Sequence, residues 1–254
     1  MIENGSQNNE WYRSWFNSPY YHLLYADRDE QEAAKFINLL IDYLQPKVHS
    51  KMLDIACGKG RHSIQLAQKN YCVTGIDISP KSIEEANQYA HENLEFFVHD
   101  MRLPFRINYY DYAFNFFTSF GYFDSLKEHQ NALRNMTLAL QPGGVFVMDY
   151  LNPVYSINNL QTTSEKEIEN IHFHISRWVD DKYIYKKIYI KDPLNNSSPL
   201  SFVEKVANFN LKDFTELFKQ NRLEITAVFG NYLLDIFDAN QSPRMIMIAR
   251  KLPA

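Results

Sequence analysis

The fold of this chain is decided by the stretch Leu53-Asp54-Ile55-Ala56-Cys57-Gly58-Lys59-Gly60-Arg61-His62-Ser63. Residues 51–57 are largely apolar and predict a buried strand, while residues 61–70 carry apolar side chains at helical spacing. The glycine-rich turn between them brings backbone N–H groups and the positive end of a helix close to a ligand, with no side chains in the way. The stretch therefore predicts a strand, a loop and a helix that cradle a nucleotide or a cofactor.

The spacing within the turn separates two kinds of cofactor site. A dinucleotide site has three glycines in the order G-x-G-x-x-G, whereas this turn reads Asp54-x-Ala56-x-Gly58-x-Gly60. That pattern resembles the first motif of the class I S-adenosylmethionine-dependent methyltransferases, D/E-x-G-x-G-x-G, with Ala56 in the first glycine position. The resemblance implies that these four residues bind the cofactor, and we expect Ala56 to keep an ordinary φ angle. An ordinary tight turn is the alternative for this pattern taken alone.

A second predicted strand, residues 71–79, ends near an acid. A carboxylate at the carboxyl end of this strand can accept hydrogen bonds from both ribose hydroxyls of a nucleoside, and Asp77 is the candidate. The resemblance also implies that the next residue, Ile78, contacts the cofactor. The alternative is that Asp77 caps the following helix, but Ser79 is the better N-cap because Pro80 then takes the first helical position.

A third predicted strand, residues 94–101, also closes on an acid. In the methyltransferases that the chain resembles, an acid at this point accepts a hydrogen bond from the exocyclic amine of adenine, and the next residue covers the ring. Asp100 and Met101 match these two positions. A surface aspartate that opens a loop is the alternative.

The fourth predicted strand, residues 110–117, leads into the methionine end of the expected cofactor site. Its last residues, Asn115, Phe116 and Phe117, are expected to line the site, and residues 118–123 to face the substrate. Hydrophobic packing is an equal alternative for each aromatic residue in this run.

A helix over residues 125–140, a Leu140-x-Pro-Gly-Gly turn and a fifth strand over residues 145–150 continue the alternation. The turn is another recurring feature of the family, because proline stops the helix and glycine supplies a positive φ. Continuous apolar strands that alternate with helices predict an α/β fold around a Rossmann-like, mainly parallel sheet. Ligands bind such sheets at the carboxyl ends of the strands, so we expect residues 51–164 to form the S-adenosylmethionine-binding core.

Residues 1–50 are expected to form an N-terminal lid segment and a helix over residues 30–44. The lid is rich in aromatic residues between residues 11 and 25, and aromatic faces attract a sulfonium cation. Tyr21 is the best single candidate for a cofactor contact. The alternative is that these rings only hold the N-terminal segment against the domain.

Residues 165–210 break the alternation of strand and helix. Apolar and polar residues alternate in three runs, separated by turns at residues 180–182 and 192–199, which predicts an antiparallel insertion of three strands after the fifth strand. We expect this insertion to roof the substrate pocket or to form a homodimer contact. Residues 211–254 then complete the core with a helix over residues 211–221, capped by Asn210, and two strands over residues 223–233 and 244–251, giving seven strands.

Composition excludes several classes of protein. No apolar run is long enough to span a membrane, and we expect no secretory signal at residues 1–4. Cys57 and Cys72 are expected to be reduced thiols of a cytoplasmic protein. A net charge of −4 at pH 7 lacks the basic excess that favours a nucleic-acid partner.

The sequence does not identify a catalytic residue. His22, Tyr122 and His129 are nominees for a general base, which only a hydroxyl or carbon acceptor would require. His172 and His174 share a strand face, but no third ligand lies close by in the sequence, so we expect no metal site.

The resemblance implies that the chain transfers a methyl group from S-adenosylmethionine to a small-molecule acceptor and leaves S-adenosylhomocysteine. The alternatives are an NAD-dependent Rossmann oxidoreductase and a non-catalytic methyltransferase-fold scaffold or partner protein. The first alternative leaves the Asp100-Met101 pair and the turn at residues 140–144 without a role. The acids Asp77 and Asp100, which match the cofactor-binding positions of the family, argue against the second alternative.

Overall fold

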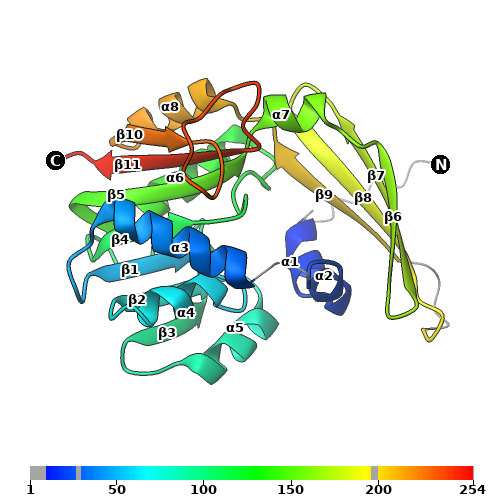
Figure 1. The fold of residues 1–254 in the computed structure, drawn as a ribbon, viewed down its shortest axis with the longest axis horizontal. Helices are drawn as coiled ribbons and strands as arrows, with labels where there is room; N and C mark the ends of the chain where they lie inside the picture. Colours follow the sequence, from blue (N-terminus) through cyan, green and yellow to red (C-terminus); the bar gives the residue numbers. More distant parts are fainter. Residues whose placement is uncertain (1–9, 27–29, 196–199, 254) are drawn as a thin grey trace.

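The structure, a computed structural model, describes residues 10–26, 30–195 and 200–253. It contains a seven-stranded sheet and a four-stranded sheet, with helices around and between them (Figure 1). The strands of the large sheet are, in spatial order, β10 (Leu223–Phe229), β11 (Arg244–Lys251), β5 (Leu140–Leu151), β4 (Tyr110–Asn115), β1 (Lys51–Ile55), β2 (Cys72–Asp77) and β3 (Leu94–Val98). Strand β11 pairs antiparallel with both of its neighbours, and the remaining pairs are parallel. The predicted Rossmann-like α/β fold with seven mainly parallel strands is confirmed.

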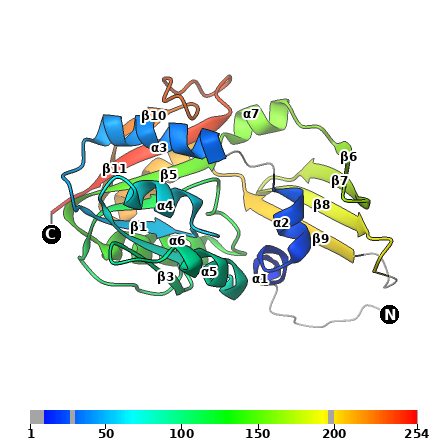
Figure 2. The same cartoon turned by 60° about the horizontal axis from the view of Figure 1, so that its bottom comes forward.

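Helices cover both faces of the large sheet, as its continuous apolar strands require. One face packs against α3 (Glu30–Leu44), α4 (Arg61–Ala67) and α5 (Pro80–Ala86), and the other against α6 (Leu126–Ala139) and α8 (Leu211–Gln220) (Figure 2). Each layer contains its own cluster of buried apolar side chains. Because the helices cover the faces, a ligand site is left at the carboxyl ends of the parallel strands.

Helix capping follows the local sequence. Ser79 caps α5 and Pro80 occupies its first position, so the predicted cap is confirmed. Ser125 and Asn210 are the N-caps of capping boxes on α6 and α8. In each box the N-cap side chain accepts the backbone N–H of the residue three positions later, and the side chain of that residue accepts the backbone N–H of the N-cap. Helix α4 is shorter than the predicted helix over residues 61–70, and β10 ends before the predicted residue 233.

The predicted turn at residues 140–144 takes the form of a bulge. Strand β5 already begins at Leu140, directly after α6. Leu140 and Val145 pair with residues of β4 that are only two positions apart, so the residues between them loop out of the register. Gly143 has a φ of +79° there, which is the positive φ that the sequence predicted for a glycine.

The insertion after β5 contains four strands, so the prediction of three was wrong. Its sheet is an antiparallel meander of β6 (Thr163–Ile168), β7 (Ile171–Val179), β8 (Tyr183–Lys191) and β9 (Leu200–Ala207). Strand β6 was missed because its sequence, Thr-Ser-Glu-Lys-Glu-Ile, is almost entirely polar, as suits an exposed edge strand. The predicted turn at residues 180–182 joins β7 to β8. Residues 196–199 of the second predicted turn lie outside the described residues, as do residues 1–4.

The inner face of this small sheet is covered by the N-terminal segment. Helices α1 (Trp11–Phe16) and α2 (Pro19–Leu24) lie between the two sheets in both ribbon views (Figures 1 and 2). Trp15 and Leu24 pack against four buried residues of β7 and β8, which are Phe173, Ile175, Ile188 and Ile190. The apolar face of the insertion therefore finds its cover within the same chain.

The remaining elements are short. Helix α7 (Pro153–Asn158) leads from the large sheet into the small one, and the 3-10 turn η1 (Asn87–Tyr89) follows α5. Across the described residues, no helix combines the length and apolar character needed to cross a bilayer.

Replacing Trp15 with alanine is expected to lower the free energy of unfolding by about 3 to 5 kcal/mol, the usual cost of deleting a large buried aromatic side chain. Trp15 is fully buried between α1 and the small sheet. The matched control is Trp178→Ala, since Trp178 is 41% exposed and loses little beyond its stacking on Tyr185, about 1.5 kcal/mol or less. Urea unfolding followed by circular dichroism measures both variants. Equal losses would show that Trp15 does not hold the insertion against α1.

Candidate functional site

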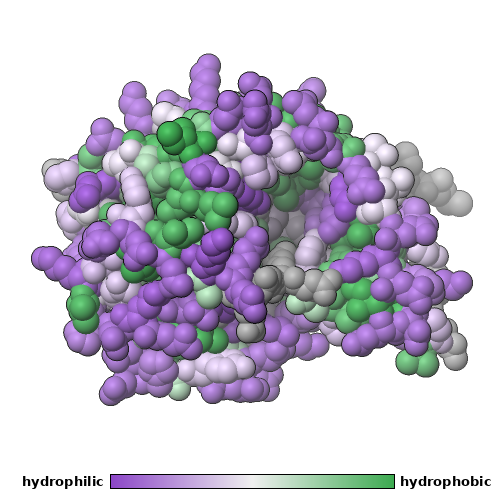
Figure 3. All heavy atoms as spheres, in the orientation of Figure 1, coloured by the Kyte–Doolittle hydropathy of each residue, from purple (hydrophilic) through white to green (hydrophobic). Residues whose placement is uncertain are grey.

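One cavity of about 650 Å³ lies at the carboxyl ends of β1 to β4, between the large sheet, the N-terminal helices and β9. On the face shown in Figure 3 the surface is hollowed between the parts that hold the two sheets. Of the residues predicted to contact a cofactor, those that line the cavity are Tyr21, Ala56, Gly58, Asp77, Ile78, Asp100, Met101 and Phe116. Asp54, Gly60 and Asn115 are not among the lining residues.

The loop after β1 presents bare backbone to this cavity. Ala56, Gly58 and Gly60 have φ angles of +61°, +57° and +83°, so the expectation of an ordinary φ for Ala56 was wrong. A Cβ atom placed on Gly58 would meet no atom within 4 Å, whereas one on Gly60 would lie 2.7 Å from the ring of Phe96. Gly58 therefore leaves room for a ligand, and Gly60 allows the helix layer to pack closely on β3.

Asp77 ties the end of β2 to this loop. Its Oδ2 accepts the backbone N–H of Gly58 at 2.8 Å, and its Oδ1 accepts the N–H of Ser79 at 2.8 Å. Burial raises the pKa of Asp77, and the backbone N–H donors oppose that rise. A carboxylate offers about four lone-pair positions, so these bonds leave Asp77 able to accept hydrogen bonds from a ligand in the cavity.

Asp54 and Asn115 lie beneath the loop. Asp54 is 1% exposed and accepts a hydrogen bond from the Ser63 hydroxyl at 2.6 Å. Asn115 is fully buried and donates to the carbonyl of Ile55 at 3.0 Å. Both side chains hold β1 and the start of α4 in place and do not face the cavity.

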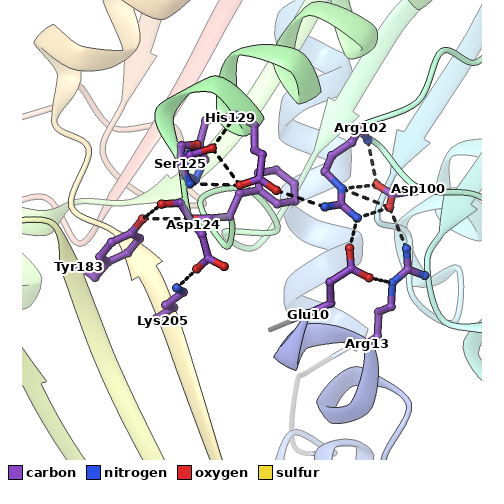
Figure 4. A network of polar contacts seen from close by, with 11 residues as sticks. Glu10, Arg13, Asp100, Arg102, Asp124, Ser125, His129, Tyr183 and Lys205 are labelled. Carbon is purple, nitrogen blue, oxygen red and sulfur yellow. Dashed lines mark hydrogen bonds and ion pairs between the residues drawn. The ribbon is translucent and has the colours of Figure 1, made fainter. Parts of the chain in front are cut away.

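Asp100 is engaged in a network of ion pairs (Figure 4). Arg102 donates to both of its oxygens, with a shortest distance of 2.7 Å, and Arg13 of α1 donates to its Oδ2 at 3.0 Å. Both arginines also pair with Glu10. Burial works to raise the pKa of Asp100, but hydrogen bonds from Arg102 outweigh it, so the pKa is lowered. An adenine amine at this position would have to share the carboxylate with two guanidinium groups.

The turn after β4 adopts a strained conformation that the sequence did not suggest. Phe117 and Thr118 have consecutive φ angles of +57° and +58°. The buried carboxylate of Asp149 accepts the N–H of Phe117 at 2.8 Å. Arg244 donates to Asp149 at 2.8 Å and to the Thr118 hydroxyl at 2.9 Å. Two features of the sequence could have indicated this arrangement: an acid, Asp149, within the apolar fifth strand, and an arginine, Arg244, at the start of the last strand.

The three nominees for a general base are placed differently. His22 and Tyr122 line the cavity, whereas His129 is 1% exposed and packs against Phe120 and Phe123. Burial, assisted by Lys59, lowers the pKa of His22, and its Nε2 has no hydrogen-bond partner among the described residues. Tyr122 donates to the carbonyl of Thr118.

The insertion contributes residues to the cavity that sequence reasoning did not name. Glu204 and Val206 of β9 line the cavity, together with Leu151 at the end of β5. His172 and His174 lie on the opposite, exposed face, beside Glu167 and Glu165. Within the described ranges, no three His, Cys, Asp or Glu side chains gather as a metal site would require.

Comparisons of the sequence with known proteins lead to methyltransferases. A family model described as a methyltransferase domain matches residues 46–191, more than half of the chain. The glycine N-methyltransferase of Rattus norvegicus is 26% identical over 152 residues, which cover 53% of this chain and 52% of that relative. The 27-O-demethylrifamycin SV methyltransferase of Amycolatopsis mediterranei (strain S699) is 28% identical over 144 residues, covering 54% of this chain and 52% of that relative. The chain thus spans about half the length of these curated relatives.

Solved structures share the fold over nearly the whole chain. An S-adenosylmethionine-dependent methyltransferase from Clostridium acetobutylicum ATCC 824 superposes with a TM-score of 0.76 at 17% identity, covering 92% of this chain and 96% of that one. At this identity the likeness concerns the fold alone.

Replacing Asp54 with asparagine is expected to change how stability depends on pH. Burial raises the pKa of Asp54 to about 7, and the Ser63 hydroxyl opposes the rise. The unfolded chain ionises this group near pH 4, so its contribution to stability is full below that pH and is lost as the pH rises towards 7. The asparagine variant has no ionisable group at position 54, so its stability does not fall for this reason as the pH rises. The difference in unfolding free energy should therefore shift in favour of the variant, by up to about 1.4 kcal/mol per pH unit in this window.

Urea unfolding of both proteins at a series of pH values from 4 to about 8 measures this difference. Asparagine keeps an acceptor oxygen for Ser63, so the hydrogen bond is retained. Asp77 is present in both proteins, and its titration largely cancels in the comparison. If the free energies of unfolding of the two proteins change in parallel with pH, the pKa of Asp54 is not raised.

Proposed function

Because the chain belongs to the methyltransferase domain family, we propose that it transfers a methyl group from S-adenosylmethionine to a small-molecule acceptor and releases S-adenosylhomocysteine. The observation that carries this proposal is the convergence of Gly58, Asp77 and Asp100 on one cavity at the carboxyl ends of neighbouring strands. Residues 1–50 would act as a lid over the core at residues 51–164, the insertion would face the acceptor, and residues 211–254 would complete the core.

The cavity fits a nucleoside-bearing cofactor in two respects. The bare backbone at Gly58 leaves space beside the loop, and the carboxylate of Asp77 has acceptor capacity that two ribose hydroxyls would use. We further propose that Ile78 and Met101 flank the adenine, that Asp100 accepts its amine while remaining paired with Arg102, and that Tyr21 lies near the sulfonium. Asp54, Gly60, Asn115 and, through the strained turn, Asp149 would position these groups.

In this proposal the protein acts mainly by positioning. S-adenosylmethionine, when bound, supplies a methyl carbon that is already activated by the sulfonium. Holding the acceptor in line with that carbon accounts for much of the acceleration. A hydroxyl acceptor would also need to lose a proton. His22 is suited to accept it, because its lowered pKa leaves it neutral near pH 7 and it lines the cavity.

The two alternatives have less support. A dinucleotide site would need a third glycine at position 63, where the chain has a buried serine that donates to Asp54. A non-catalytic scaffold would not need an open cavity lined by ligand-binding groups. The two curated relatives are named for different acceptors, glycine and a demethylrifamycin, so the acceptor is proposed only as a small molecule.

Two further proposals concern the setting of the protein. The unpaired Cys57 and Cys72 favour the cytoplasm. A homodimer through the insertion would use its outer face, because the inner face is already covered by α1 and α2.

Titration of the purified chain with S-adenosylhomocysteine and with NAD(H) tests the proposed function. Isothermal calorimetry is expected to show micromolar-range binding of S-adenosylhomocysteine, about −8 kcal/mol, and no comparable binding of NAD(H). A preference for NAD(H) would overturn the assignment.

Replacing Asp77 with alanine is expected to weaken S-adenosylhomocysteine binding by roughly 30- to 150-fold, since charge-assisted hydrogen bonds worth about 2 to 3 kcal/mol are lost. Asp77 also holds Gly58 and Ser79, so a second ligand isolates the ribose contact. The 2′-deoxy analogue of S-adenosylhomocysteine should bind the wild type more weakly than the parent compound, and the alanine variant about equally. An equal penalty in both proteins would show that Asp77 does not contact the 2′-hydroxyl.

A further inference from the structure

Among the residues that the structure describes, one charged side chain lines the end of the cavity away from the glycine-rich loop. The lining residues at this end come from α2 and the residues after it, from the segment after β4, from the end of β5 and from β9, and they include Tyr21, Tyr25, Tyr122, Leu151, Glu204 and Val206. Glu204 is the charged residue among them. The other formally charged residues that line the cavity, Lys59, Arg61, Asp77 and Asp100, belong to the loop after β1, the start of α4 and the ends of β2 and β3.

Glu204 is largely withdrawn from solvent and accepts its hydrogen bonds from neutral donors. Its side chain is 16% exposed. Its Oε1 accepts the indole N–H of Trp15 at 2.6 Å, and the Tyr25 hydroxyl lies 2.8 and 3.1 Å from the two carboxylate oxygens. The ammonium of Lys186 forms an ion pair with Oε2 at 3.7 Å and donates a hydrogen bond to the Tyr25 hydroxyl. At 3.7 Å the ion pair is too long to be a hydrogen bond to the carboxylate. The carboxylate therefore has room for one more donor, and a cationic donor would strengthen that bond.

A row of aromatic rings begins at Tyr25, whose hydroxyl donates to this carboxylate. The ring centroids of Tyr25 and Tyr21 are 5.0 Å apart, those of Tyr21 and Phe16 are 5.0 Å apart, and those of Phe16 and Tyr122 are 5.4 Å apart. Such a continuous wall attracts cations through the electron-rich ring faces, and the ammonium of Lys186 lies 4.5 Å from the centroid of the Tyr25 ring. An anion at the same place would meet both the ring faces and a partly desolvated carboxylate of like charge.

We propose that the acceptor carries an ammonium group, which Glu204 recognises by a charge-assisted hydrogen bond within this aromatic wall. The inference rests on the proposed function, because it takes this end of the cavity as the acceptor site beside the cofactor. It concerns binding of the ammonium form. Transfer of the methyl group to a neighbouring atom would leave the ammonium group unchanged, whereas transfer to that nitrogen would first require it to lose a proton to a base such as His22, which lines the cavity. Glu204 is then the residue through which the insertion selects the acceptor.

The competing explanation is that Glu204 only fastens the lid to the insertion through Trp15 and Tyr25. Glu204→Gln separates the two roles, because glutamine keeps an acceptor oxygen for these donors and nearly the same shape but has no charge. A fastening role would survive this change, whereas recognition of an ammonium group would not. Glu165→Gln is the matched control, since Glu165 is 82% exposed on the outer face of β6.

The experiment uses the full chain saturated with S-adenosylhomocysteine and three probes that share one ring, namely cyclohexylamine, cyclohexanol and cyclohexanecarboxylate. Ligand-observed NMR titration gives their dissociation constants. The wild type and Glu165→Gln should bind the amine most tightly. In Glu204→Gln the amine should bind about tenfold or more weakly, while the alcohol is little changed. Lys186→Met removes the nearby competing charge and should shift amine binding in the opposite direction, towards higher affinity.

The inference is overturned if the amine binds no better than the alcohol, if Glu204→Gln keeps the preference for the amine, or if none of the probes binds. Thermal unfolding and S-adenosylhomocysteine binding of Glu204→Gln show whether the variant keeps its fold and its cofactor site. If the wild type itself fails to bind S-adenosylhomocysteine, the proposed function fails. In that case the affinities of the three probes, measured without S-adenosylhomocysteine, still test whether Glu204 recognises an ammonium group.

Discussion

An apolar sheet face has to be covered, and in this protein the layer that covers it also forms one wall of the cavity. Helices α1 and α2 bury Trp15 and Leu24 against the small sheet. The same segment turns Tyr21 and Tyr25 into the cavity and extends Arg13 to the carboxylate at the end of β3. The packing of the insertion, the closure of the cavity and the charge balance around Asp100 therefore depend on one short stretch of chain. Loss of that packing would open the site on two sides.

The loop after β1 presents mainly backbone to the cavity. Three alternate residues of the loop after β1 adopt positive φ, which costs an alanine about 1 to 2 kcal/mol at Ala56. Local bonds offset this cost: the N–H of Cys57 donates to Ile76 and that of Gly60 to Cys57, each at 3.0 Å. Asp77 adds its bond to Gly58. The conformation is thus held by the neighbouring strand as much as by the glycines, which explains why alanine is tolerated there.

The wall beside the loop depends on a buried ion pair. Asp149 is fully buried, and Arg244, its partner on the antiparallel strand β11, also reaches Thr118. Removing one charge from such a pair leaves the other buried and uncompensated, which is strongly destabilising. The pair therefore supports the positive φ angles of Phe117 and Thr118. In this way the last strand of the chain shapes a part of the cavity to which its own residues contribute no lining.

The sequence by itself determined the α/β fold, because buried parallel strands need continuous apolar runs, and helix starts need capping residues such as Ser79 and Asn210. It also determined which acids stand at strand ends, since that depends only on local order along the chain. Only the tertiary structure decided what those acids contact. Asp54 is turned inward, Asp100 is shared with Arg13, and Glu204 of β9 lines the cavity while it accepts the indole N–H of Trp15. The contacts of Asp100 and Glu204 join residues more than 80 positions apart, and no local pattern of polarity or spacing encodes such distances.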